Sequence, residues 1–316
     1  MPIHDLGYRS WEGERSSNML RWWVIAQTGI HLVWKNSALK RMLFFSWMPV
    51  LVFAGMIFFY EQALKQSPES LKFVVSMLQN FDTSKGGEFN ELIHELRTDP
   101  EKARHQVWAT ILLILFRAPQ AVLMVMMVSI IAPSLISRDM RSRAFLLYFS
   151  RPITPKEYVL GKSLIVWAFL TMITGVPALL LYGLAVLLSP DLGVVLATWD
   201  LPFRIILATA VLAIPTTAVA LCFSSMTTES RYATFGWFAV WVLGWVTYSM
   251  IVSIQKTPAE YWRLVSPYHT LGKVQSWVFG VGGGFNQVAP EATMILVVTT
   301  VALFILMRRV AAPMKI

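Results

Sequence analysis

The sequence is short of charged residues. Only 14% of its 316 positions are Asp, Glu, Lys or Arg, whereas soluble domains usually contain about 25%. Hydrophobic residues make up 56%, which argues against both an ordinary soluble enzyme and a disordered chain. The hydrophobic residues gather in long blocks, so the sequence predicts an all-α, polytopic membrane protein.

Cysteine and catalytic signatures are scarce as well. Cys222 is the one cysteine, so no disulfide forms within this chain. The five histidines are scattered without an i, i+4 pair, and we expect no metal site. Gly161-Lys162-Ser163 resembles the end of a phosphate-binding loop, but Lys156 stands where that loop needs a glycine. We therefore expect no enzyme activity and no cofactor in this chain.

Six apolar blocks are long enough to cross the hydrocarbon core, which takes about 20 helical residues. They cover 42–60, 107–136, 164–188, 203–226, 233–254 and 292–307. Several contain prolines, which membrane helices tolerate as kinks when neighbours bind the freed carbonyls. The sequence thus predicts a single transmembrane domain over 1–316, with six transmembrane helices.

Lysine and arginine are unevenly divided between the segments that connect these blocks. The segments on the side of both termini contain sixteen, and those on the opposite side contain nine. The first set is 1–41, 137–162, 227–232 and 308–316, and the second is 61–106 and 256–289. Because cytoplasmic loops are rich in basic residues, we expect a multi-pass protein of the cell (inner) membrane with both termini cytoplasmic. The net charge of +9 then reflects topology rather than nucleic-acid binding.

Three of the remaining segments have helical patterns. Apolar residues, three of them tryptophans, recur at near-helical spacing in 19–38, which favours an N-terminal interfacial helix, although packing against the bundle would give the same pattern. The extracytoplasmic loop 61–106 contains two amphipathic stretches and predicts two short helices. The apolar segment 256–289 is interrupted by Pro267 and predicts a re-entrant outer segment before the last span, with a glycine turn at 280–284.

The cytoplasmic connection 137–162 is the most informative part of the sequence. It begins with a charged turn, continues with an apolar run over 145–149 and stops at Ser150-Arg151-Pro152. Thr154 then predicts a helix N-cap, with Pro155 at the first helical position and Glu157 closing a capping box. The pattern indicates a short helix across the inner surface, followed by a new helix that rises into the third span.

This connection resembles that of the ABC type-2 permease family, the membrane subunits of ATP-binding-cassette exporters. In that family an acidic residue precedes an apolar helix, a Ser-x-Pro step and a turn that ends in Gly-Lys. The corresponding positions here are Asp139, 145–149, Ser150-Arg151-Pro152 and Gly161-Lys162. Three departures are Asp139 in place of Glu, Arg141 where a second acid is common, and Arg143 where glycine is usual.

The resemblance implies a permease subunit of an ATP-driven exporter. It implies a dimer with a second copy or a related permease, and two copies of a separate ATPase subunit that binds ATP and Mg. The residues that it assigns to ATPase coupling are Asp139, Arg141, Arg143, Phe145, Leu146, Tyr148 and Pro152. The aromatic and leucine side chains would enter a groove on the ATPase, with the charged residues at its rim. The alternative is a helix lying on lipid headgroups, where the same arginines would meet phosphates.

Two features inside the blocks are candidates for a substrate pathway. Trp237, Trp241 and Trp245 repeat every four residues and share one helix face, which either lines a pathway or packs. Arg117 lies well inside the membrane if the second span begins at residue 107. If that span covers 118–137, Arg117 instead extends to the outer interface.

A stand-alone secondary transporter or channel is the alternative function. Such proteins usually carry paired acids within their spans. The apolar blocks contain no such pair, and Glu291 lies only near the start of the last block. The pattern therefore favours the permease, while the transported substrate is not implied by it.

Overall fold

The structure is a computed structural model that describes residues 21–66, 103–142, 144, 153–189, 193–255 and 260–312. Every regular element within these ranges is helical, which confirms the all-α class. The first elements are α1 Arg21–Trp34, α2 Ser37–Trp47, α3 Pro49–Gln66, α6 Arg104–Arg117, η2 Ala118–Gln120 and α7 Leu123–Arg141. The others are α9 Pro155–Leu170, η3 Thr171–Gly175, α10 Val176–Leu188, α11 Gly193–Thr198, α12 Leu201–Met226, α13 Ser230–Gln255, η4 Glu260–Val265, α14 Pro267–Phe279 and α15 Phe285–Ala311.

Six stretches of helix in the described ranges are long and apolar enough to cross a membrane. They are Ser37–Gln62, Leu123–Arg141, Pro155–Leu188, Gly193–Met226, Ser230–Ile254 and Phe285–Ala311. Each overlaps one of the six predicted spans, and most extend several residues beyond it. The expectation of six transmembrane helices is therefore supported by the length and composition of the observed helices.

The second span differs from its prediction as one continuous helix over 107–136. The α-helix α6 ends at Arg117, the 3-10 turn η2 follows, and α7 begins only at Leu123. Pro119 lies within this turn and has no backbone N–H to continue the α-helical pattern. Of these two helices, α7 is long and apolar enough to cross a membrane. Helix α6 is a separate helix that precedes it in the chain.

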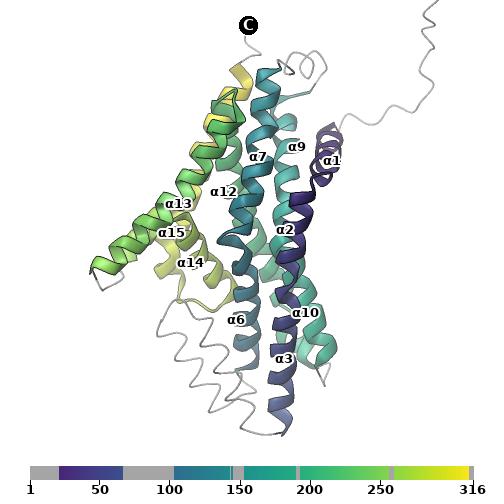
Figure 1. Ribbon diagram of the computed structural model, residues 1–316. Coiled ribbons are helices and arrows are strands. Elements are labelled where there is room, and N and C mark those ends of the chain that lie inside the picture. The colour runs from purple at the N-terminus through teal and green to yellow at the C-terminus, as the bar shows by residue number, and fades with distance from the viewer. Residues whose placement is uncertain are drawn as a thin grey trace, which may run out of the picture.

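Helix α12 lies at the centre of the bundle, in contact with α7, α9, α13, α14 and α15. Figure 1 shows α6 and α7 as one long column, with α2 and α3 beside it. Helix α1 packs along α9, whereas α13 diverges from the bundle toward its C-terminal end (Figure 1). Large aromatic side chains fill the interior between these helices, among them Trp108, Phe116, Tyr158, Phe169 and Trp237.

The third span contains a π-helical turn, η3, directly before Pro177. Since proline has no N–H, the carbonyl of Ile173, four residues earlier, is free of its usual helical partner. The Ser46 hydroxyl of α2 donates a hydrogen bond to this carbonyl at 2.6 Å, and Trp47 Nε1 donates to the Met172 carbonyl at 2.8 Å. Side chains of α2 thus donate hydrogen bonds to carbonyl groups of the π-helical turn, and these bonds join the first span to the third.

A second proline, Pro133, is accommodated in the same way within α7. The carbonyl of Ser129, four residues before it, accepts a hydrogen bond from the Thr234 hydroxyl of α13 at 3.5 Å. The Ser224 hydroxyl of α12 donates to the Pro133 carbonyl at 2.8 Å. Polar side chains from two other spans therefore fix the position of α7 around its internal proline.

Three predicted helix boundaries in the connecting segments are found in the structure, at Thr154, Pro267 and Gly280. Thr154 caps α9 and forms the predicted capping box with Glu157. Pro267 begins α14, and Gly280 ends it with a φ of 75°, a left-handed conformation that favours glycine. The two short helices predicted in the outer loop 61–106 lie mainly outside the described residues.

Candidate functional site

An ion pair joins the last turn of α7 to the middle of α9. Lys162 Nζ lies 2.8 Å from Asp139 Oδ2. The same carboxylate accepts a hydrogen bond from the Tyr158 hydroxyl at 2.6 Å, and Lys162 Nζ is 5.4 Å from the centre of the Tyr158 ring. We call Asp139, Tyr158 and Lys162 the α7–α9 clamp.

The clamp is largely shielded from solvent. The side chains of Lys162 and Asp139 are 11% and 17% exposed, and Tyr158 is completely buried. Removing one partner of such a pair leaves an uncompensated charge, at a typical cost of about 3–5 kcal/mol. The clamp therefore holds α7 to α9, the helices that come directly before and after the predicted coupling segment in the chain.

Gly161, next to Lys162 in the family pattern, has a packing role. A methyl group at this position would lie 2.8 Å from the backbone oxygen of Trp22 and 2.9 Å from Ile25 Cβ, both in α1. Only a glycine lets α1 and α9 approach so closely. The Gly-Lys pair thus positions α9 against two neighbouring helices. Its glycine packs against α1, and its lysine forms an ion pair with Asp139 of α7.

The remaining coupling candidates fall into two groups. Arg141 Nη1 lies 3.3 Å from Glu229 Oε1, in the turn between α12 and α13, and its side chain is 68% exposed. Such an exposed pair contributes about 1 kcal/mol at most. The other candidates lie outside the described residues: Arg143, Phe145, Leu146, Tyr148 and Pro152.

The three tryptophans of α13 have different surroundings. Trp237 is buried and donates a hydrogen bond from Nε1 to the Val125 carbonyl of α7 at 2.9 Å. Trp241 is buried beside it, with ring centres 5.5 Å apart. Trp245 is 53% exposed. The first two therefore attach α13 to the bundle, and only Trp245 presents its ring at the surface.

Arg117 ends α6, and its side chain turns into the protein toward α14. Its guanidinium carbon lies 4.7 Å from the centre of the Tyr268 ring. The break after α6 agrees with the alternative in which the span starts after Arg117. The side chain nevertheless packs inside the protein rather than extending to the surface, because α14 covers it.

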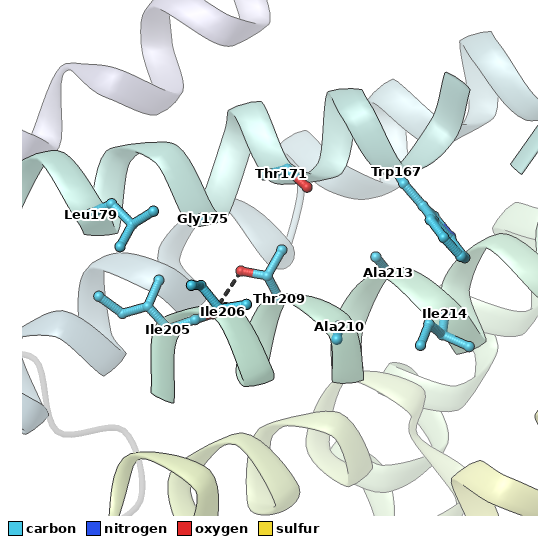
Figure 2. A pocket seen from close by; sticks show the side chains of 10 residues that line it. All are labelled: Trp167, Thr171, Gly175, Leu179, Ile205, Ile206, Thr209, Ala210, Ala213 and Ile214. Carbon is cyan, nitrogen blue, oxygen red and sulfur yellow. Dashed lines mark hydrogen bonds between the residues drawn. The ribbon is translucent and has the colours of Figure 1, made fainter. Parts of the chain in front are cut away.

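An apolar groove of about 250 Å³ lies between the third span and α12. Figure 2 shows Trp167, Thr171 and Gly175 on one wall, facing Thr209 and Ala213 on the other. The Thr209 hydroxyl is bonded to the Ile205 carbonyl of its own helix at 2.8 Å. The groove thus offers mainly hydrocarbon surface, suited to apolar groups. Among the residues described, no three His, Cys, Asp or Glu side chains gather to hold a metal ion.

Comparison with known proteins identifies the family. The family model described as "ABC-2 family transporter protein" matches residues 33–310. The chain belongs to this family. A search of the curated proteins finds no match. The match includes the α7–α9 clamp and the six spanning helices up to residue 310, whereas most of α1 lies before it.

Family membership makes this chain a transmembrane permease subunit of an ABC transporter, a multi-pass membrane protein. In such a transporter ATP hydrolysis belongs in general to a partner ATPase, and the permease is normally not catalytic. The sequence pattern singled out Asp139 but gave no role to Tyr158 or Glu229. A lysine near the start of an apolar span was the available signal, because a cation there needs a counter-ion.

Proposed function

We propose that this ABC-2 permease is the membrane subunit of an exporter, paired with a second permease and driven by two ATPase subunits that bind ATP and Mg. In this proposal both termini and the 137–162 connection face the cytoplasm. Helix α1 lies along the inner leaflet, and the η4–α14 segment enters the outer leaflet. The positive charge of the termini and of the 137–162 connection supports this orientation.

The α7–α9 clamp is the observation that carries the proposal. Transport requires movement of the ATPase to reach the spans through a connection that does not simply bend. The clamp ties together the two helices that flank the predicted docking segment. A force applied to residues 143–152 would therefore move α7 and α9 as one unit. Asp139 then acts as a positioning residue within its own chain, while Phe145, Leu146 and Tyr148 are the docking residues.

The test is recovery of the ATPase subunit on immobilised permease from detergent, at concentrations near the dissociation constant. Phe145→Ala removes an aromatic anchor, and we expect a loss of about 2 kcal/mol, or roughly thirtyfold in affinity. Arg143→Ala should cost about 1 kcal/mol or less if it is a solvated rim charge. Asp139→Asn should leave recovery unchanged but lower thermal stability.

Each alternative gives a different result in this experiment. Equal recovery with wild type and Phe145→Ala would contradict docking and favour the lipid-headgroup arrangement. Reduced recovery with Asp139→Asn at unchanged stability would place Asp139 at the rim instead of in the clamp. ATP hydrolysis by the purified permease without a partner would contradict the assignment of ATP hydrolysis to a separate ATPase subunit.

A further inference from the structure

The contact between α6 and α14 is built around a single cation. Arg117 lies six positions before the first residue of α7, and its guanidinium stacks over the Tyr268 ring. Gly272, one turn further along α14, provides the room. A methyl group at Gly272 would lie only 2.7 Å from Arg117 Nη1. This face of α14 is therefore shaped to admit the guanidinium.

Within the described ranges, this cation has no counter-ion. Among the residues that the structure describes, Arg117 takes part in no ion pair, and its buried Nε has no hydrogen-bond partner. Gln275 is fully buried, and neither atom of its amide is bonded. It lies three positions after Gly272, hence on the same face of α14. Two buried polar groups on this contact thus have unused hydrogen-bonding capacity, which is costly unless a ligand satisfies it.

Two arginines act on His269, which lies on α14 beside this contact. Burial, together with the charges of Arg117 and Arg263, lowers the pKa of His269 to about 4. His269 is therefore neutral at neutral pH, and its Nδ1 lies 2.8 Å from the Ser266 hydroxyl. A positive field of this kind repels a metal cation and attracts an anion.

We propose that Arg117 and Gln275 bind a phosphate group between α6 and α14. The guanidinium supplies a planar fork of donors that matches phosphate oxygens, and the glutamine amide supplies a further donor. The site lies near the end of the second span that is opposite Arg138 and Arg141. At this level the phosphate belongs either to a phospholipid headgroup or to a soluble anion. The site is separate from the α7–α9 clamp and does not depend on ATPase coupling.

The experiment follows thermal unfolding of the full-length permease in an uncharged detergent. One arm adds sodium phosphate against sodium chloride of equal ionic strength. The other arm adds short-chain phosphatidylglycerol against a diacylglycerol with the same chains. We expect stabilisation in at least one arm, and an apparent dissociation constant about tenfold or more weaker in Arg117→Gln. Gly272→Ala keeps the charge but displaces the guanidinium, so it should weaken binding similarly.

Arg231→Gln is the matched control, because Arg231 is an exposed arginine at the start of α13. It should respond to both probes like wild type. Stabilisation by the lipid alone identifies a headgroup, and stabilisation by inorganic phosphate alone identifies a soluble anion. No stabilisation of the wild type in either arm would overturn the proposal, as would equal stabilisation of wild type and Gly272→Ala. If Arg117→Gln does not fold, Gly272→Ala still decides the outcome.

Discussion

Glu61 is a nearly completely buried carboxylate near the end of α3 that holds the start of α6. It forms an ion pair with Arg104, accepts a hydrogen bond from Trp108 Nε1 at 3.1 Å and lies 3.4 Å from the Ser189 hydroxyl. At the scale of single residues, a buried charge of this kind fixes the positions of the helices that supply its partners. If one partner moves away, the carboxylate loses a hydrogen bond or an ion pair that the apolar interior cannot replace.

We expect Glu61→Gln to lower the free energy of unfolding by about 3–5 kcal/mol, since it removes the buried charge from the ion pair with Arg104. Glu229→Gln is the matched control. It removes an acid from the exposed pair with Arg141, so it should cost about 1 kcal/mol or less. Unfolding in detergent, followed by tryptophan fluorescence, measures both. Equal small losses would show that Glu61 does not hold α3 to α6.

His269 makes the stability depend on pH. Its pKa is lowered from 6.5 to about 4 by burial and by two nearby arginines. Between these values the unfolded chain binds a proton that the folded protein does not, so stability falls as the pH drops from about 6.5 to about 4. His269→Asn keeps a polar group near Ser266 without titrating.

The measurement for His269 is the melting temperature of wild type and His269→Asn across this pH range. We expect the variant to show a shallower decline at acid pH, and the difference between the two curves isolates the histidine. Replacement of the exposed His31 by Gln should leave the wild-type slope unchanged. Parallel curves for wild type and His269→Asn would contradict the lowered pKa.

At the scale of helices, the sequence predicted starts better than breaks. The start of α9 was predictable because Thr154 and Glu157 act on each other within one turn. The sequence left open whether the second span starts at residue 107 or after Arg117, since apolar residues continue on both sides of Pro119. The π-helical turn before Pro177 depends on a hydroxyl from another span. A pattern within one segment contains no information about such a partner.

Substitution of Ser46 measures how much a hydrogen bond from α2 stabilises the π-helical turn of the third span. Ser46→Ala leaves the Ile173 carbonyl without its 2.6 Å donor in a buried place. We expect a loss of about 1–3 kcal/mol, the usual cost of an unsatisfied buried group. Ser253→Ala is the control, because its hydroxyl bonds only within α13 and is exposed. Unfolding in detergent measures both, and equal costs would show that the π-helical turn needs no support from α2.

At the scale of the whole molecule, hydropathy and the cytoplasmic connection were sufficient to predict the six spans and the family. The pairing of distant residues was not predictable. Arg117 and Gly272 are far apart in sequence, and only the folded bundle shows that the glycine makes room for the guanidinium. The same is true of Arg141 and Glu229. Hydropathy reports which segments avoid water, whereas these contacts depend on how the helices are arranged.

We expect the orientation of the bundle to follow from its charge distribution. With sixteen basic residues on the side of the termini and nine opposite, we expect Ser142 in the cytoplasm and Ser84 outside. The buried Cys222 is first replaced by Ala, so that each added cysteine is the only thiol. A membrane-impermeant maleimide applied to intact cells should then label Ser84→Cys. It should label Ser142→Cys, an exposed position just after α7, only after the cells are opened. Labelling of both positions from outside would contradict this topology, because α7, the span found in the described part of the chain between them, should separate the two positions.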